Sequence, residues 1–214
     1  MKKSYKVRLK TNKTLENQLF QFLGASRYAY NWAIVTVEEY YKENKSTISE
    51  SDLRKLFTLH KKETGKEWTK EISNDVFKQG IRDCYDAYRK FFKKLAKKPK
   101  FKKKFFYPQS FYIDVLKIKF IEDSLKPEKL PWIKLCEKNR IPLGVKYYNP
   151  RVIYDGRYFY ITVSVDVEPN TIDLDENLSI GIDLGIKTFA TIAECKTDGS
   201  VGYYSYDTLK KQIS

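Results

Sequence analysis

One β-strand pattern opens the chain, and only helical patterns follow it until β-patterns return beyond residue 110. Residues 4–10 alternate apolar and basic side chains, which is typical of a half-buried strand with one charged face. The apolar positions are Tyr5, Val7 and Leu9, and the basic positions are Lys6, Arg8 and Lys10. Three helices are therefore predicted to be inserted between this first strand and the rest of the fold.

Each predicted helix carries apolar residues at a spacing of three or four, which makes one apolar stripe. The first helix is expected to start at Thr14 as N-cap, with Gly24 allowing close packing or a bend. Its stripe is Leu15, Leu19, Phe22, Ala25, Ala29, Ala33 and Val37. The second helix is expected to start at Ser51 or Asp52 and to carry Leu53, Leu56, Phe57 and Leu59. The third has Ser73 as cap and carries Phe77, Ile81, Cys84, Tyr88, Phe91 or Phe92, and Leu95.

The second half of the chain is rich in β-patterns. Strands are predicted over residues 111–120, 144–148, 152–154 and 158–167, with Asp155-Gly156 as a hairpin turn before the last. The acidic stretch 169–177, with its Pro and Asn residues, reads as a linker, and a domain boundary is placed near residue 175. Beyond it, residues 179–184, 189–195 and 200–206 are predicted to form three consecutive strands.

The positive charge is concentrated in the N-terminal half. The chain has 41 Lys and Arg and 27 Asp and Glu, and residues 1–104 hold 27 of the basic but only 12 of the acidic residues. The net charge of +14 therefore arises in that half. A basic half joined to a near-neutral half indicates a surface that binds a polyanion, most often nucleic acid, although a solvated lysine-rich face is the alternative.

The densest basic stretch is residues 89–104, with ten basic residues in sixteen and no acid. Like charges repel one another, so such a stretch is expected to be solvated or matched by a partner, and release of counterions on binding phosphates supplies that match. Lysine contacts of this kind fix a nucleic-acid backbone without reading sequence. Interleaved Phe91, Phe92 and Phe101 could stack on bases, but the helical spacing of Phe91 and Phe92 favours a core position.

Other kinds of site are weakly supported. The three cysteines are more than fifty residues apart with no C-x-x-C, so neither a zinc site nor a disulfide framework is indicated. The single histidine, His60, is expected at the surface near the end of a basic helix. No secretory leader and no run of about 20 apolar residues is present, so a soluble, reducing, intracellular setting without membrane contact is expected.

One carboxylate, Asp183, lies in an apolar β-type run, followed by Gly185 and Lys187. A charge buried among Ile180, Ile182 and other apolar residues costs several kcal/mol, on the order expected for an unpaired ion, so it normally has a partner or a metal. Asp183 is therefore the candidate catalytic and metal-binding residue. An ordinary edge-strand or capping role is the alternative.

Several motifs together resemble the TnpB (OrfB) nucleases encoded by bacterial insertion sequences, which are related to type V CRISPR effectors. The run GIDLGIKTFAT at residues 181–191 resembles the first RuvC motif of that family. GASRYAYNWA at residues 24–33 resembles an early helix of the family. SNDVFKQ at 73–79, AYRKFF at 87–92 and PKFKK at 99–103 are similar to its third helix and the segment after it, in the same order.

The resemblance implies an α+β fold. Residues 1–12 and 100–172 would form a β-barrel-like wedge domain, residues 13–98 a helical recognition lobe, and residues 178–214 the first strands of an RNase H-like (RuvC) domain. Family members bind a guide RNA from the transposon end and cut target DNA with Mg²⁺ held by carboxylates. Asp183 would be the first metal ligand. Nucleic acid would meet Arg27, Asn31, Lys97, Lys98, Lys100, Lys102, Lys103 and Lys104.

The chain also departs from the family. The second and final carboxylates and a four-cysteine zinc element of the family are not found here, and Glu194 and Asp198 follow Asp183 too closely to replace them. Two-metal cleavage needs several carboxylates. The expected function is therefore that of the N-terminal part of a TnpB-like RNA-guided DNA endonuclease, truncated and unable to cleave alone, whose partners are guide RNA, target DNA and a missing C-terminal half or a full-length homologue.

Two alternatives stay open. A nuclease-inactive module could bind guide RNA or DNA and act as a repressor or accessory protein. A basic β/α protein could bind structured RNA, with Asp183 in a structural role.

Overall fold

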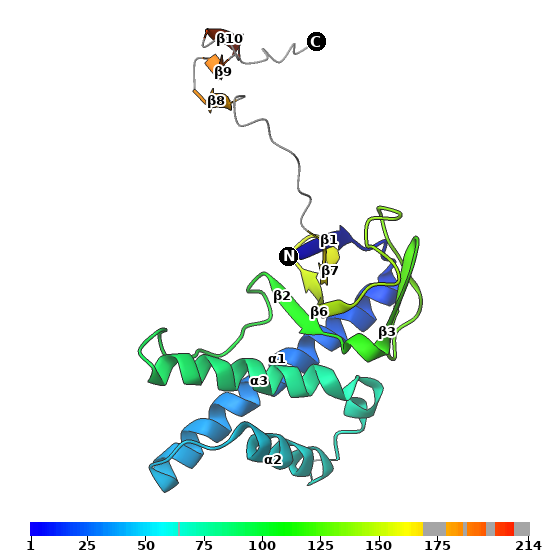
Figure 1. Cartoon of the computed structure of the whole chain (residues 1–214). Helices are drawn as coiled ribbons and strands as arrows, with labels where there is room; N and C mark the ends of the chain where they lie inside the picture. The colour runs from blue at the N-terminus through cyan, green and yellow to red at the C-terminus, as the bar shows by residue number, and fades with distance from the viewer. Residues whose placement is uncertain (64, 169–178, 186–187, 196–199, 208–214) are drawn as a thin grey trace. The chain divides into compact units, whose positions relative to one another are not determined.

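The computed structural model describes all residues except 64, 169–178, 186–187, 196–199 and 208–214. The chain divides into two compact units, Met1–Val167 and Glu168–Ser214. The first unit is a mixed α/β structure in which three long helices lie between the first strand and all later strands (Figure 1). Its elements are β1 (Lys2–Arg8), α1 (Lys13–Asn44), α2 (Glu50–Glu63), η1 (Glu67–Glu71), α3 (Asn74–Phe92), β2 (Gln109–Tyr112), η2 (Val115–Lys117), β3 (Ile118–Ile121), β4 (Ser124–Pro127), β5 (Ile133–Lys134), β6 (Tyr147–Tyr154) and β7 (Phe159–Asp166).

The N-cap of helix α1 lies two residues before the predicted cap. Asn12, not Thr14, is the N-cap, because its Oδ1 accepts a hydrogen bond from the backbone N–H of Leu15 at 2.9 Å. The predicted apolar stripe is confirmed in full, since all seven of its members are buried. Leu23, Tyr30 and Ile34 widen it, so α1 presents a broad apolar face to the rest of the first unit.

Helices α2 and α3 pack beside α1 (Figure 1). Ser49 caps α2, with its hydroxyl accepting from the backbone N–H of Asp52 at 3.1 Å. Leu53 and Phe57 are buried as predicted, but Leu56 and Leu59 are exposed, because only one face of this short helix meets the core. In α3 the predicted residues from Phe77 to Tyr88 are buried, whereas Phe92 and Leu95 are exposed.

A close contact between α3 and α1 lies at Gly80 of α3. A β-carbon added there would lie 2.8 Å from the carbonyl oxygen of Ser26 and 3.1 Å from the β-carbon of Ala29, both on α1. Gly24, which the sequence suggested as the position of close packing, has only a flexible atom of Arg27 at 3.8 Å. The close approach of the helices therefore depends on the glycine of α3.

Strand β1 pairs with β7, more than 150 residues later, in a four-stranded antiparallel sheet of order β1-β7-β6-β2. Val7 and Leu9 are buried and Lys6, Arg8 and Lys10 are exposed, as the alternation predicted. The hairpin turn at Asp155 is confirmed, with its Oδ1 accepting from the backbone N–H groups of Arg157 and Tyr158. Parts of the predicted strands 144–148 and 152–154 form one strand, β6, which starts only at Tyr147 and has an irregularity between Tyr148 and Arg151.

A second antiparallel sheet of order β3-β4-β5 adjoins the first. An isolated bridge joins Leu9 to Leu135, and the backbone N–H of Cys136 donates to the carbonyl of Arg8 at 2.9 Å. The predicted strand 111–120 is therefore interrupted: β2 belongs to the first sheet, β3 to the second, and η2 turns the chain between them.

The second unit contains three antiparallel strands in the order β10-β9-β8. These are β8 (Ser179–Asp183), β9 (Thr188–Cys195) and β10 (Val201–Asp207), close to the predicted ranges. The predicted linker, residues 169–177, lies outside the described residues. Among the described helices of the whole chain, none is both long and apolar enough to cross a membrane.

Acid is expected to weaken the junction between α3 and the second sheet. The Ser73 hydroxyl donates to Glu128, and Lys117 lies 3.2 Å from the same carboxylate and 2.7 Å from that of Asp75. The Ser73 and Lys117 hydrogen bonds lower the pKa of Glu128 against the opposing effect of burial. A carboxylate with a lowered pKa stabilises the folded state above its unfolded pKa, and this contribution is lost as pH falls through the folded pKa.

Glu128→Gln is therefore expected to lower the free energy of unfolding by about 1 kcal/mol at neutral pH, and by much less at a pH below the folded pKa of Glu128, where the wild-type carboxyl is protonated. Urea unfolding of both proteins at the two pH values measures this. An equal loss at both would show that the charge of Glu128 does not contribute.

Candidate nucleic-acid interface

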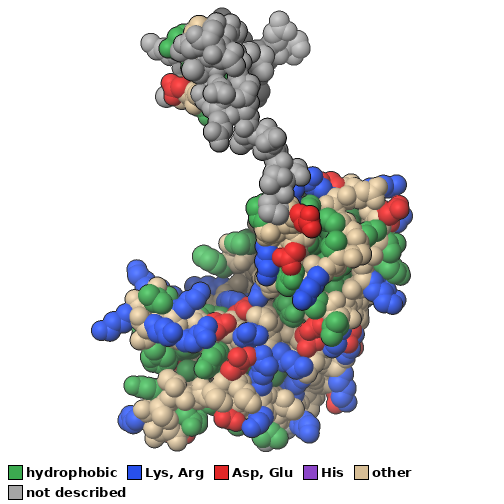
Figure 2. All heavy atoms as spheres, viewed as in Figure 1, with side chains coloured by type: hydrophobic (Ala, Val, Ile, Leu, Met, Phe, Trp, Pro, Cys, Tyr) green, Lys and Arg blue, Asp and Glu red, His purple; other side chains and the backbone are tan. Residues whose placement is uncertain are grey.

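The basic segment, residues 93–108, leaves the C-terminal end of α3 and returns to β2 (Figure 1). It contains all six lysines that the sequence assigned to nucleic acid. Lys97, Lys100, Lys103 and Lys104 are exposed, and no carboxylate of the described residues lies within 4.0 Å of their ammonium groups. Figure 2 shows Lys and Arg side chains gathered at the end of α3 that this segment leaves. Their charge is thus available to an anionic partner.

The other two lysines of the set are already engaged by the protein. The ammonium of Lys98 lies 2.8 Å from the carboxylate of Glu38, which also accepts from the hydroxyl of Tyr88. Lys102 is exposed as a whole residue, but its ammonium turns back over the ring of Tyr30, 4.0 Å from the ring centroid. Burial of that amine lowers the pKa of Lys102. Lys98 and Lys102 are therefore less available for contacts with phosphates than the other four lysines.

Asn31 and Arg27, on successive turns of α1, hold the basic segment against the helix. The Asn31 Nδ2 donates to the carbonyl of Lys102 at 3.0 Å, and its Oδ1 accepts from the backbone N–H of Lys102 at 2.8 Å. Arg27 Nη1 donates to Gln109 Oε1 at 2.8 Å, and the Gln109 amide donates to the carbonyl of Lys104. Both residues thus position the lysines, and their direct contact with nucleic acid stays a prediction.

Asn31→Ala is expected to loosen the basic segment without unfolding the helices. It removes two hydrogen bonds, each contributing about 1 kcal/mol, from a segment that water can reach. Limited trypsin digestion with fragment mapping should show cleavage after Lys100 to Lys104 accelerated by roughly tenfold. Asn44→Ala is the matched control, because Asn44 also lies on α1 and donates a single hydrogen bond, to Tyr40. Equal cleavage rates in the two variants would rule out this role for Asn31.

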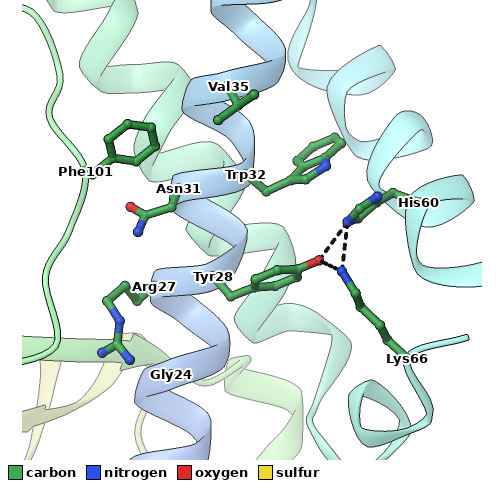
Figure 3. A pocket seen from close by; sticks show the side chains of 9 residues that line it. All are labelled: Gly24, Arg27, Tyr28, Asn31, Trp32, Val35, His60, Lys66 and Phe101. Carbon is green, nitrogen blue, oxygen red and sulfur yellow. Dashed lines mark hydrogen bonds between the residues drawn. The ribbon is translucent and has the colours of Figure 1, made fainter. Parts of the chain in front are cut away.

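An open hollow of about 630 Å³ lies against α1, between the basic segment and α2. Figure 3 shows Phe101, Asn31 and Arg27 on one side of α1, and Tyr28 with His60 and Lys66 on the other. The Tyr28 hydroxyl is 2.7 Å from His60 Nε2, and Lys66 donates to the same hydroxyl. His60 also stacks on the ring of Trp32, with centroids 5.5 Å apart. The expectation that His60 is a surface residue is wrong, because this cluster half-buries it.

Asp183 is the last residue of β8, opposite Thr191 of β9, and it is exposed. Its neighbours Ile180 and Ile182 are 63% and 64% exposed, so the argument from a buried charge does not hold for this unit. Gly185 does allow a tight turn, since a β-carbon there would lie 2.9 Å from the carbonyl oxygen of Thr188. Lys187 and Asp198 lie outside the described residues.

Magnesium binding by Asp183 has no further support from its surroundings. Among the described residues, no group of three or more His, Cys, Asp or Glu side chains could hold a metal ion. A single exposed carboxylate does not make a site for Mg²⁺, which is held by carboxylates together with substrate phosphates. The assignment of Asp183 as a catalytic and metal-binding residue stays a prediction.

Comparison with known proteins gives two matches to the sequence. The family model HTH_OrfB_IS605, described as a helix-turn-helix domain, matches residues 1–46. The protein named "Putative RNA-guided DNA endonuclease InsQ", from Escherichia coli (strain K12), is 25% identical over 197 residues, which cover 89% of this chain. Both matches support the assignment of this chain to the TnpB (OrfB) family.

The chain spans about half the length of InsQ, 47%. The helix-turn-helix label of the family model does not describe the local structure, because residues 1–46 contain β1 and the single helix α1. Among solved structures, one titled "Cryo-EM structure of the Cas12f1-sgRNA-target DNA complex" aligns with a TM-score of 0.44 and 12% identity, over 97% of this chain and 57% of that chain.

Sequence reasoning missed part of the candidate interface. It named neither Gln109, which links Arg27 to the backbone of Lys104, nor Lys66, which joins Tyr28 and His60. Phe105 and Phe106, which are 77% and 75% exposed, were also not named. For Phe105 and Phe106, the available signal was the run of lysines and aromatic residues that follows Lys100.

Proposed function

We propose that this chain binds a guide RNA and the DNA with which that guide pairs. The related InsQ is named for RNA-guided DNA endonuclease activity, and the family assignment makes the same partners the first hypothesis here. The observation that carries the proposal is the set of four exposed lysines without carboxylate partners among the described residues, fixed to α1 by Asn31 and Arg27. Such a row binds phosphates and leaves sequence recognition to base pairing.

In this proposal the chain up to residue 172 has two parts. Residues 13–98 act as a helical recognition lobe, and residues 1–12 with 100–172 act as a wedge-type β domain. The pairing of β1 with β7 and the insertion of three helices between β1 and β2 support this division. The basic segment connects the two parts, so a nucleic acid bound along it would touch both.

Residues 178–214 are proposed to be the start of a RuvC domain, with Asp183 as its first carboxylate. The three-strand antiparallel order and the tight turn at Gly185 support this part of the proposal. The proposal is limited to binding, since the described residues around Asp183 do not form a metal site from which a cleavage step could be derived.

The test is to purify the chain from cells that express its native locus and to sequence the RNA that survives a wash at moderate salt. Enrichment of one transcript from the transposon end is the expected result. The variant with Lys97, Lys100, Lys103 and Lys104 changed to Gln serves as the control and should lose that transcript. Recovery of only bulk cellular RNA, in proportion to its abundance, would overturn the guide-binding function.

A further inference from the structure

Three aromatic rings of the basic segment point into solvent although its backbone is fixed. Phe101, Phe105 and Phe106 are 56%, 77% and 75% exposed. The segment around them is held by the Asn31 and Gln109 hydrogen bonds and by Tyr107, whose ring packs edge-on against Tyr154 with centroids 5.4 Å apart. Exposed apolar rings on an anchored backbone are unfavourable in water, and a contiguous set of them indicates a binding surface.

The rings border two open hollows with basic walls. Phe101 and Phe106 line one of about 760 Å³, together with Lys100 and Lys103. Phe105 lines another of about 580 Å³, together with Lys104 and Lys13. Arg27 belongs to both, and no acidic residue lines either hollow in the described part of the chain. Aromatic ring faces and positively charged side chains thus lie together in both hollows beside α1.

This combination of aromatic rings and positive charges matches the chemistry of an unpaired nucleotide strand. In a duplex the base faces are covered by neighbouring pairs, so a duplex could use the lysines but not the rings. A single strand offers both a phosphate for each lysine and a free base face for each ring, and stacking on aromatic side chains tolerates any base. An apolar protein partner would instead have to desolvate four unpaired lysines, which is unfavourable.

We infer that Phe101, Phe105 and Phe106 form a stacking surface for consecutive unpaired nucleotides, with Lys100, Lys103 and Lys104 binding the intervening phosphates. This inference rests on the proposed nucleic-acid function and assigns single-stranded nucleotides to this part of the interface. It predicts that the rings and the lysines contribute in different ways: the lysines give a salt-dependent affinity for any strand, whereas the rings give a salt-independent preference for unpaired strands.

The test compares two variants of the full chain by fluorescence anisotropy. One carries Phe101→Leu, Phe105→Leu and Phe106→Leu, which keeps apolar side chains at exposed positions and so leaves the core unchanged. The other carries Trp132→Leu, a matched control because Trp132 is 47% exposed and lies outside the basic segment. The probes are a labelled oligouridylate, a labelled oligothymidylate of the same length, and blunt RNA and DNA duplexes. Circular dichroism verifies that the variants are folded.

The triple leucine variant is expected to bind the single strands on the order of 100-fold more weakly. Its affinity for the duplexes and its salt dependence should stay unchanged, and Trp132→Leu should bind like the wild type. A loss confined to oligouridylate would assign the surface to RNA, and a loss confined to oligothymidylate would assign it to DNA.

Several results would overturn the inference. The triple variant could bind single strands as tightly as the wild type, while a variant with neutralised lysines binds them more weakly. In that case the stacking surface is wrong and the proposed function stands. If the wild-type chain binds none of the probes, both are wrong. If the triple variant loses binding to phosphatidylserine vesicles but keeps its oligonucleotide affinity, the rings are a membrane contact instead.

Discussion

Changing Lys97, Lys100, Lys103 and Lys104 together to glutamine is expected to weaken RNA binding on the order of 100-fold at physiological salt. Each lysine that neutralises a phosphate of a single strand contributes about 0.7 to the slope of log affinity against log salt, so the slope should become shallower by about 3. Filter binding or anisotropy over a salt series measures both quantities. The four were chosen because no described carboxylate pairs with them, which leaves their full charge available.

The matched control removes the same charge from elsewhere. Lys42, Lys119, Lys134 and Lys138 are exposed, lie outside the basic segment and likewise have no described carboxylate within 4.0 Å of their ammonium groups. Changing these four to glutamine lowers the net charge equally, so it reports the effect of overall charge on RNA attraction. A salt slope that falls equally in both quadruple variants would mean that binding follows net charge, and the basic segment would lose its assignment.

The lysines illustrate how far sequence reasoning reaches at the interface. Residues 89–104 stood out by composition alone, and the structure exposes them. Composition treats all lysines alike, however, whereas the fold pairs Lys98 with Glu38 and turns Lys102 onto Tyr30. Both partners are more than fifty residues away in sequence, and no local pattern encodes a contact of that range.

In the fold, too, features set by neighbouring residues were predictable, whereas features set by contacts between distant residues were not. The stripe of α1, the alternation of β1 and the turn at Asp155 were all predictable, because each depends on residues within a few positions of one another. The N-cap was misplaced by two residues because Asn12 and Thr14 both favour capping, and only the geometry of the first turn decides between them. Leu56 and Leu59 were misassigned because the core reaches only one face of α2.

The contacts of His60 and Asn31 were not foreseen for a related reason. A single histidine among lysines near a helix end is typical of a surface position, but Tyr28 and Trp32 of α1 project toward it and cover it. Asn31 was assigned to nucleic acid through a resemblance, which stays a prediction, and the structure adds two hydrogen bonds from its side chain to the backbone of Lys102. In both cases the partner comes from a different helix or segment, so the tertiary structure decides the role.

Glycine substitutions in α1 and α3 should have opposite effects on stability. Gly80→Ala is expected to lower the free energy of unfolding by about 2 kcal/mol, because its β-carbon would lie 2.8 Å from a backbone carbonyl of α1 that cannot rotate away. The loss of helix–helix contact outweighs the gain of up to about 1 kcal/mol that alanine brings to a helix interior. Urea unfolding followed by helical circular dichroism measures the change.

Gly24→Ala is the control for the same substitution in a helix without a close neighbour. Only the end of the flexible Arg27 side chain lies within 4 Å of the added carbon, so alanine is expected to raise the free energy of unfolding by up to about 1 kcal/mol. The sign of the two changes therefore separates backbone approach from helix propensity. If both substitutions stabilise the chain, α1 and α3 are not in close backbone contact at Gly80, and the basic segment that connects α3 to β2 would have to follow a different path along α1.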